Sequence, residues 1–145
     1  MTETRKYTVE EVTQQLGITA RTLHYYEEVG LLPDVSRTEG RHRLYCENML
    51  ARTRHILKLK QVLGASLQEI RDILQAEEEL DRIKASYYEE LHTEEERDVL
   101  LDEAVLRLEA IIGHIEEKME KLRGLREGFA ERLARANALK HRTRG

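Results

Sequence analysis

The chain has 145 residues and a net charge of −4 at pH 7, and 36% of its residues are charged. This length fits one compact domain or a small domain with an extension, and the single phenylalanine and absent tryptophan argue against one large core. The sequence lacks a run of about eighteen apolar residues and a secretory signal, so we expect a cytoplasmic protein with no membrane partner. The single cysteine excludes an intrachain disulfide and multi-cysteine metal or iron–sulfur sites, and we expect no metal and no cofactor.

The charges are segregated along the chain. Residues 37–60 contain seven Arg or Lys against two Glu, whereas residues 76–103 contain twelve acidic residues against three bases. Residues 104–145 contain ten bases and six acids. A basic block beside an acidic one favours a phosphate-facing surface next to one kept away from phosphate, but ordinary surface decoration explains the pattern equally well.

Two short helices are predicted near the start of the chain. Residues 8–11, Thr-Val-Glu-Glu, form a capping box that opens the first helix, and Gly17 ends it. Thr19 can cap the second helix, which Gly30 ends. The short connection with its turn glycine is typical of a helix-turn-helix, whose second helix lies in the DNA major groove. Alone this is a weak signal, because many small helical proteins contain such a pair.

The next segment strengthens the prediction. Residues 31–45 interrupt the helical pattern and predict a two-stranded wing, and the tip at residues 41–43 reads Arg-His-Arg. Cationic side chains on a hairpin suit the phosphate backbone and the minor groove. Residues 47–63 are predicted helical, and a second capping box at residues 66–69 opens another helix. The predicted order is therefore helix, helix, wing, helix, helix.

Three stretches in this order resemble one known family. They read YTVEEVTQQLGITARTLHYYEEVGLLP, RTEGRHRLY and LKLKQVLGASLQEIRDIL, and they lie between Tyr7 and Leu74. Together they resemble the N-terminal domain of MerR-family transcriptional regulators. The resemblance implies a mainly α fold, with a winged helix-turn-helix domain followed by a long dimerisation helix that pairs as an antiparallel coiled coil.

The resemblance also implies which residues contact DNA. They fall on the second helix, the wing and the third helix: Arg21, His24, Tyr25, Arg37, Arg41, His42, Arg43, Tyr45, Lys58 and Lys60. The chemistry agrees, because a Tyr hydroxyl donates to phosphate oxygens and Arg binds phosphate or guanine through two donors. Tyr26 is expected in the core. The family often has Arg where this chain has His24, and residues 50–64 are one residue longer than usual, so either Lys58 or Lys60 is the cation that faces DNA.

The C-terminal part of the chain carries a heptad pattern. Nine of the ten core positions are apolar, namely Leu101, Val105, Leu108, Ile112, Ile115, Met119, Leu122, Phe129 and Leu133. The exception is Arg126. A stripe this long predicts a coiled coil, most simply with a second copy of the chain. The alternative is a hairpin in which this region folds back on itself within the chain. The region lacks the turn signals that such a hairpin would need, which argues against this alternative. The resemblance implies an antiparallel twofold dimer, and hence an inverted-repeat operator.

These features predict four regions. Residues 1–75 form the winged helix-turn-helix domain, and residues 76–93 form a linker or accessory helix. Residues 94–139 form the dimerisation helix, and residues 140–145 form a disordered basic tail.

Two features have alternative interpretations. Cys46 precedes the third helix, where it is interpreted as a partly buried, weak N-cap, and the alternative is a thiol switch. Tyr87 is interpreted as packing and Tyr88 as exposed, and the alternative is an aromatic pocket formed by both. His92 and His114 are too isolated to propose as metal ligands.

The function follows from the resemblance. It implies a homodimeric, sequence-specific regulator that binds double-stranded DNA at a promoter and distorts the spacer so that RNA polymerase can engage. The alternative is a coiled-coil interaction adaptor without specific DNA binding. The sequence shows no nucleophile–base pairing, phosphate loop or HExxH spacing, so we expect no enzyme. A small-molecule effector stays open as a further partner, as do the operator and the sign of regulation.

Overall fold

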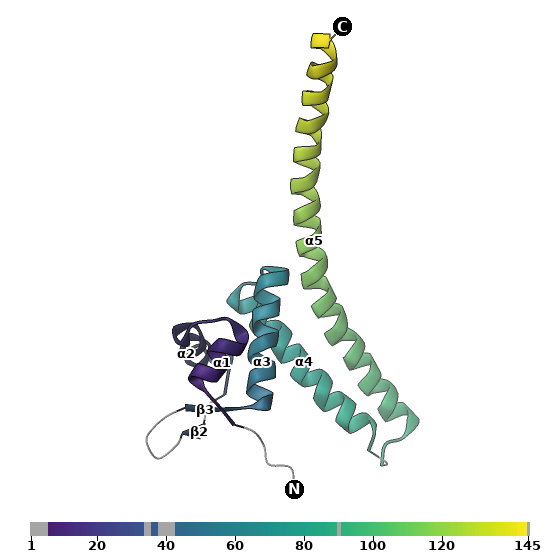
Figure 1. The fold of residues 1–145 in the computed structure, drawn as a ribbon. Helices are drawn as coiled ribbons and strands as arrows, with labels where there is room; N and C mark the ends of the chain where they lie inside the picture. Colours follow the sequence, from purple (N-terminus) through teal and green to yellow (C-terminus); the bar gives the residue numbers. More distant parts are fainter. Residues whose placement is uncertain (1–5, 34–35, 38–42, 90, 145) are drawn as a thin grey trace. The chain divides into compact units, whose positions relative to one another are not determined.

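The structure is a computed structural model that describes residues 6–33, 36–37, 43–89 and 91–144. Its elements follow in the order β1 (Lys6–Thr8), α1 (Val9–Leu16), α2 (Ala20–Glu28), β2 (Ser36–Arg37), β3 (Arg43–Cys46), α3 (Glu47–Lys58), the π-helical turn η1 (Leu59–Leu63), α4 (Leu67–Tyr87) and α5 (Glu94–Arg144) (Figure 1). The chain divides into two compact units, Met1–Arg71 and Asp72–Gly145. The predicted fold class, mainly α with a winged helix-turn-helix and a long C-terminal helix, is confirmed.

The helix α1 begins at the predicted capping box. The Thr8 hydroxyl oxygen accepts from the Glu11 backbone N–H at 3.2 Å, and the Glu11 carboxylate accepts from the Thr8 N–H at 3.3 Å. Together these contacts satisfy two backbone donors that a helix start leaves unpaired. Gly17 ends the helix with a φ of +66°, a conformation that side chains disfavour. The chain then turns directly into α2, where the Thr19 hydroxyl accepts from the Thr22 N–H at 3.2 Å.

The wing is part of a three-stranded antiparallel sheet with the order β1-β3-β2. The predicted pairing of β2 with β3 is confirmed, with Arg37 and Arg43 as register partners. The sequence pattern did not reveal β1, because three residues are too few to show an alternation. Tyr7 of β1 is the register partner of Tyr45, and both are buried. Arg41 and His42, predicted at the tip, lie outside the described residues.

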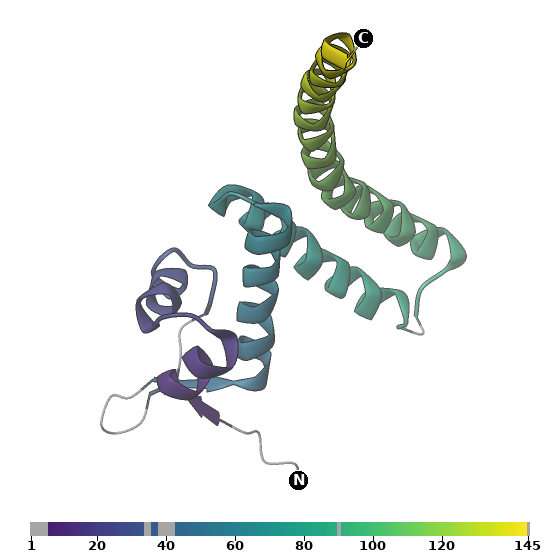
Figure 2. The same cartoon turned by 45° about the horizontal axis from the view of Figure 1, so that its top comes forward.

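The helices of the N-terminal unit pack around one apolar core. Figures 1 and 2 show α1 and α2 beside α3, with the strands at the end where α3 begins. The least exposed large side chains in this unit are Val12, Leu23, Leu31, Tyr45 and Ile56. Apolar residues on the inner side of α3, such as Ile56, are buried. Leu59 and Leu63 lie in η1 and are only partly buried.

The turn η1 offers a place for the one extra residue that the resemblance implies in residues 50–64. Its last hydrogen bond runs from the Gly64 N–H back to the Leu59 carbonyl, five residues earlier. A π-helical turn holds one more residue than an α-helical turn. We infer that η1 takes up the extra residue locally, so that the residues after it keep their orientation relative to α3.

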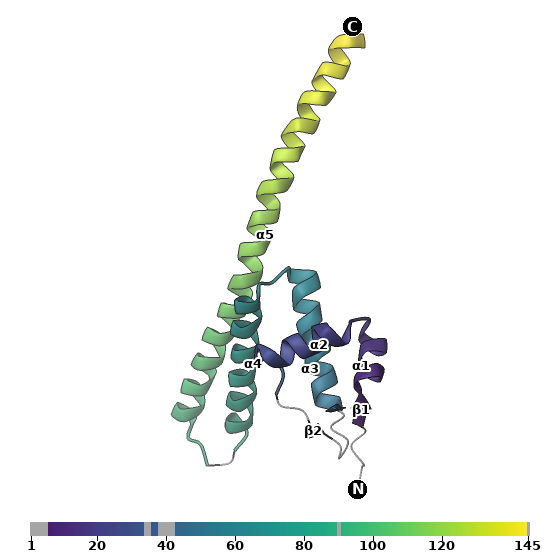
Figure 3. The ribbon, with the colours of Figure 1, turned by 90° about the vertical axis from the view of Figure 1, so that its left-hand side faces the viewer.

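The C-terminal unit is a helical hairpin with one long arm. Figure 3 shows α5 running beside α4 and then continuing well beyond it. The predicted border at residues 75–76 falls inside α4, which is one continuous helix of 21 residues. The disordered tail predicted for residues 140–145 is likewise replaced by helix, because α5 continues to Arg144. The part of the chain that the structure describes contains no helix with the length and apolar character needed to span a membrane.

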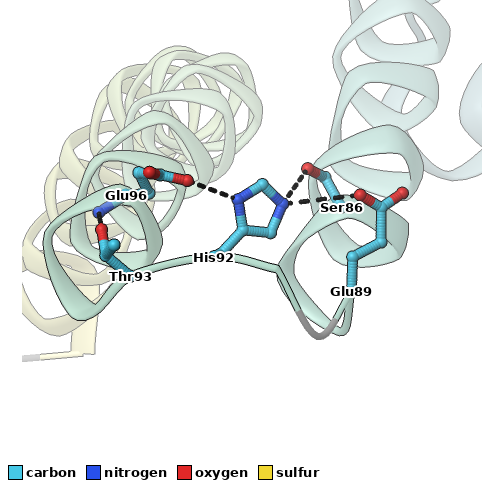
Figure 4. Close-up of polar contacts among 5 residues, drawn as sticks. All are labelled: Ser86, Glu89, His92, Thr93 and Glu96. Atoms are coloured by element: carbon cyan, nitrogen blue, oxygen red, sulfur yellow. Dashed lines mark hydrogen bonds and ion pairs between the residues drawn. The ribbon is translucent and has the colours of Figure 1, made fainter.

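The connection between α4 and α5 is organised around His92 (Figure 4). Its Nδ1 lies 2.9 Å from a carboxylate oxygen of Glu96, and its Nε2 lies 3.1 Å from the Ser86 hydroxyl. An ionised carboxylate only accepts hydrogen bonds, so Nδ1 carries the proton and donates to Glu96. Thr93 caps α5 by accepting from the Glu96 N–H at 3.2 Å. His92 therefore links the last turn of α4 to the first turn of α5.

We predict that deleting Gln61, an exposed residue of η1, leaves the N-terminal unit folded. The deletion converts the five-residue turn into an ordinary α-helical turn. Deleting the exposed Arg54 of α3 instead rotates the following residues by about 100° and turns apolar side chains away from the core. Thermal unfolding followed by circular dichroism should stay cooperative for the first variant only. Equal loss in both variants would contradict this account of η1.

A second prediction concerns the carboxyl group of Glu96. The hydrogen bond from His92 is the main cause that lowers the pKa of Glu96 below its ordinary value of 4.5. Because the folded pKa is lowered, the stabilising contribution is present at neutral pH and is lost as pH falls through that lowered pKa. In carbon-detected NMR titrations, His92→Ala should raise the Glu96 pKa towards its ordinary value. The control Ser86→Ala, which removes one contact of the other ring nitrogen, should change it much less.

Candidate nucleic-acid interface

The outer face of α2 brings three of the predicted DNA-contacting residues together. Arg21, His24 and Tyr25 are spaced three and four residues apart, so they share one side of the helix. Arg21 is exposed, and Tyr25 is 47% exposed although it is a large aromatic residue. With Glu28 they line a shallow hollow of about 510 Å³. Sequence reasoning missed Glu28, whose carboxylate could accept a hydrogen bond from a cytosine amino group.

Tyr26 supports this face from the inside. It is 3% exposed, which confirms its predicted place in the core, and its ring centroid lies 6.1 Å from that of Tyr25. Burial, and then the neighbouring Tyr25, raise the pKa of Tyr26, so its phenol stays neutral. The Nε2 atom of His24 is buried without a hydrogen-bond partner among the described residues. A ligand at this face can therefore reach only the remaining edge of the His24 ring.

Tyr45 differs from its predicted role. The resemblance placed it in contact with phosphate, but its side chain is 1% exposed. Its hydroxyl donates to the carboxylate of Glu27 on α2. Strand β3 pairs with β1 on one edge, and the strand pattern directs this side chain towards the helices. In the structure Tyr45 therefore ties the wing strand to α2 from inside the unit.

Two cations hold the segment that leaves α2. The Arg52 Nε donates to the Leu31 carbonyl at 2.7 Å, and the Arg71 guanidinium donates to the Val29 carbonyl. Val29 is the C-cap of α2, and carbonyls at the end of a helix lack partners within the helix and carry partial negative charge, so a cation stabilises them. Sequence reasoning counted Arg52 in the basic block and missed both contacts. No local pattern reveals them, because the partners lie 21 and 42 residues apart.

The other predicted contact positions are distributed over the wing and the third helix. Arg37 and Arg43 lie opposite each other in β2 and β3. Lys58 is the last residue of α3 and Lys60 lies in η1, and both are exposed. Helix residues two positions apart point to different sides. A single flat ligand surface can therefore contact only one of these two lysines. Which of them it contacts stays open, as it does from sequence alone.

The nine apolar heptad residues of α5 are all solvent-exposed. Their exposed fractions range from 42% for Ile115 to 62% for Phe129 and Leu133. The others are Leu101, Val105, Leu108, Ile112, Met119 and Leu122. We call these nine residues together with Arg126 the α5 seam. Apolar side chains exposed along several helical turns mark a surface that another molecule covers.

The remaining apolar exposure on α5 lies outside the α5 seam. Val99, Leu106, Leu125 and Leu139 are all more than half exposed. Leu125 and Leu139 occupy heptad positions that border the α5 seam, so a partner helix would cover part of them as well.

Cys46 stands at the N-cap of α3 without a side-chain hydrogen bond to the helix. It is partly buried and borders a hollow of about 300 Å³ that Lys6 and Arg52 also line. This matches the predicted weak cap, and the thiol switch stays a prediction. The described part of the chain holds no group of three His, Cys, Asp or Glu placed to bind a metal ion.

The tyrosine pair at the end of α4 is arranged for packing. Tyr87 and Tyr88 meet edge to face with ring centroids 5.2 Å apart, and the Arg97 guanidinium lies 5.8 Å from the centre of the Tyr87 ring. Tyr88 is 73% exposed, whereas Tyr87 is partly buried. These positions agree with the interpretation of Tyr87 as packing and Tyr88 as exposed.

Comparison with known proteins identifies relatives of this chain. The family model described as "MerR HTH family regulatory protein" matches residues 7–77. The HTH-type transcriptional regulator YfmP of Bacillus subtilis is 34% identical over 131 residues, covering 86% of this chain and 92% of YfmP. The nodulation protein NolA of Bradyrhizobium diazoefficiens is 36% identical over 97 residues, covering 67% of this chain. The chain spans only 40% of that longer relative.

A solved structure is also similar to this chain. It is the crystal structure of HiNmlR, described as a MerR family regulator lacking the sensor domain, bound to promoter DNA. The similarity has a TM-score of 0.46 and 25% sequence identity, and it covers 80% of each chain.

The buried contact between Tyr45 and Glu27 predicts a loss of stability in Tyr45→Phe. A hydrogen bond to a charged group contributes about 1.5–3 kcal/mol when buried. Because Glu27 is only partly buried, we expect the free energy of unfolding to fall by about 1–2 kcal/mol. Urea denaturation of the full chain measures this change. The control Tyr88→Phe removes an exposed hydroxyl and should change stability by less than about 0.5 kcal/mol.

Proposed function

Because this chain belongs to the MerR family of DNA-binding transcription regulators, we propose that it binds an inverted-repeat operator in a promoter as a homodimer. It would regulate transcription by distorting the promoter spacer for RNA polymerase, in the cytoplasm. The observation that carries the proposal is the exposed pair of Arg21 and Tyr25 on α2, the second helix of the helix-turn-helix.

The geometry of α2 supports a role in reading DNA. Its inner face is fixed by Leu23 and Tyr26, which are buried, while Arg21 and Tyr25 stay accessible on the opposite side. Arg can donate two hydrogen bonds to a guanine or a phosphate, and a Tyr hydroxyl can donate one to a phosphate oxygen. A rigid helix with such side chains fits the major groove. His24 would contribute through one ring edge.

The wing would add contacts to the phosphate backbone. We propose that Arg37 and Arg43, opposite each other in β2 and β3, position the protein on phosphates together with the tip residues 41–42. Tyr45 would act indirectly, because its buried hydroxyl holds β3 against α2. One of Lys58 and Lys60 would supply a further phosphate contact. Phosphate contacts fix the register of a protein on DNA, and base contacts provide specificity.

The α5 seam supports the homodimer. Its nine apolar side chains remain between 42% and 62% exposed in the single chain, so a second α5 would remove a long apolar surface from water. A twofold dimer presents two copies of α2, and successive major grooves on one side of DNA are one helical turn apart. An inverted-repeat operator is the sequence counterpart of this symmetry.

We predict that Tyr25→Phe and Arg43→Ala weaken operator binding without changing the mass of the dimer. Each lost phosphate or base contact should cost about 1–3 kcal/mol. Arg43→Ala should also reduce the slope of log affinity against log salt by about one. Fluorescence anisotropy with labelled duplex at several salt concentrations measures both effects.

The C-terminal unit offers matched controls for these variants. Tyr88→Phe removes another exposed tyrosine hydroxyl, and Arg135→Ala removes another exposed cation. Both should leave affinity unchanged. If Tyr25→Phe and Arg43→Ala bind like these controls, the proposed interface is wrong, and an adaptor role that needs no DNA contact becomes the better account.

The operator can be found by selecting genomic fragments on the purified full-length protein. Bound fragments should contain an inverted repeat located between the two promoter elements that RNA polymerase recognises. Recovery of fragments without a shared repeat would contradict sequence-specific binding. A repeat outside the spacer would contradict the distortion mechanism and leave the proposed dimer and interface intact.

A further inference from the structure

The α5 seam contains one polar residue in an otherwise apolar set. Arg126 occupies a core position of the heptad pattern, and its neighbours in the α5 seam, Leu122 and Phe129, are large and apolar. A cation in the core of a coiled coil lowers stability unless a counter-charge meets it, and such residues fix the alignment of the helices. The chain therefore needs an acidic partner for Arg126 once the α5 seam is covered.

We infer that a second copy of the chain covers the α5 seam in one specific antiparallel alignment, in which Arg126 meets Glu109 of the partner subunit. This inference rests on the homodimer proposed above and specifies which residues face each other. In this alignment the twofold axis passes midway between Ile115 and Met119.

The spacing of the apolar residues selects this alignment. Each heptad has two core positions, its first and its fourth residue. In an antiparallel coiled coil, the first position of one helix faces the fourth position of the other. Placing Ile115 opposite Met119 of the partner subunit brings the remaining core positions opposite one another as well. The facing pairs are then Ile112 with Leu122, Val105 with Phe129, Leu101 with Leu133, and Leu108 with Arg126. Every pair without Arg126 joins two large apolar side chains.

Alignments that differ by one heptad are worse. A slip in one direction places Glu94 and Asp98 opposite Leu133 and Phe129, which would bury carboxylates among apolar side chains. A slip in the other direction places Lys140 opposite Leu101 and pairs Val105 with the small Ala136. The first alignment is the one in which every large apolar residue of the α5 seam except Leu108 faces another.

Charge complementarity is compatible with this alignment, but the apolar pairing is what selects it. The equivalent flanking residues one heptad away, Asp102 and Glu116, are also acidic and exposed, so Arg126 would meet a carboxylate after a slip as well. In the proposed alignment, Glu109 of the partner subunit lies one residue away from Arg126 along the helix axis, a rise of about 1.5 Å. Glu109 occupies the heptad position that flanks this side of the core, and it is exposed in the single chain. Arg123, at the flanking position of its own helix and also exposed, points towards the same carboxylate. Arg123 and Arg126 of one chain thus meet Glu109 of the partner subunit. The twofold symmetry of the dimer produces the same contact a second time.

This alignment would set how far one α5 is shifted along the other. A slip of one heptad changes this shift by about 10.5 Å. The apolar pairing and the contact of Arg126 with Glu109 of the partner subunit would together fix it.

Cysteine cross-linking tests the alignment directly. Cys46 is the only native cysteine, so Cys46→Ser provides a clean background. The variant Ile112→Cys with Leu122→Cys should form a covalent dimer under mild oxidation, because a disulfide requires Cα atoms within about 7 Å. Two controls report other arrangements: Ile112→Cys with Phe129→Cys reports the alignment one heptad away, and Ile112→Cys alone reports a parallel pair. Cross-linking of either control as fast as the first variant would overturn the inference.

Charge exchange tests the contact independently of cross-linking. Glu109→Lys should weaken dimerisation about tenfold or more, because it places a cation beside Arg123 and Arg126. Adding Arg126→Glu should restore most of that loss. The control Glu117→Lys, exposed on the far side of the helix, should leave dimerisation unchanged. Glu109→Lys behaving like Glu117→Lys, or no recovery in the double variant, would overturn the inference.

These outcomes separate the alignment from the proposed function. Dimer mass is read by light scattering across a dilution series, and operator binding is read by anisotropy on the same samples. A dimer that binds its operator but cross-links in another alignment removes only this inference. A monomer at all concentrations, with no duplex preference, removes the proposed function as well.

Discussion

The candidate interface depends on the side-chain contacts that hold the C-terminal end of α2 in place. α2 is short, and side chains of β3, α3 and the start of α4 bind its last turn and the residues that follow it. Tyr45 donates to Glu27, while Arg52 and Arg71 donate to the carbonyls of Leu31 and Val29. Because these contacts come from elements far along the chain, α2 is fixed only when the whole N-terminal unit has folded. Its exposed face is then presented by a rigid support, as a reading helix requires.

In the C-terminal unit, as far as the structure describes it, only the first part is held by contacts between helices of the chain. Its first part is a hairpin held by the ion pair of Arg107 with Glu79 and by the hydrogen bonds of His92. Beyond that hairpin, the apolar residues of α5 have little of their own chain to contact. The exposed apolar residues of α5 therefore suit contact with another molecule, and their chemistry determines which molecule can bind. The antiparallel pairing that we propose for these residues would favour a second copy over an unrelated protein.

The sequence predicted most of this organisation because its signals were local. The capping box at Thr8 and the terminating Gly17 each depend on neighbouring residues, and the structure confirms both. The heptad pattern is local as well, and its residues lie on the continuous helix α5. The features that sequence reasoning missed depend on distant partners. The burial of Tyr45 and the contact of Arg52 with a carbonyl arise from packing between elements. From sequence alone, a cation or a phenol in such a place is easily interpreted as a residue that contacts a ligand. The three residues of β1 were too few to show a pattern.

The acidic connection between α4 and α5 has a consequence for how fast the protein would find DNA. Glu89, Glu94, Glu95 and Glu96 are exposed there, whereas the basic residues cluster between positions 37 and 60. Each of these two segments responds to the field of a polyanion by its own charge, so phosphates attract the basic segment and repel the acidic one. Encounters through the basic segment therefore become more frequent than uncharged surfaces would allow, and this kinetic advantage declines as ionic strength rises.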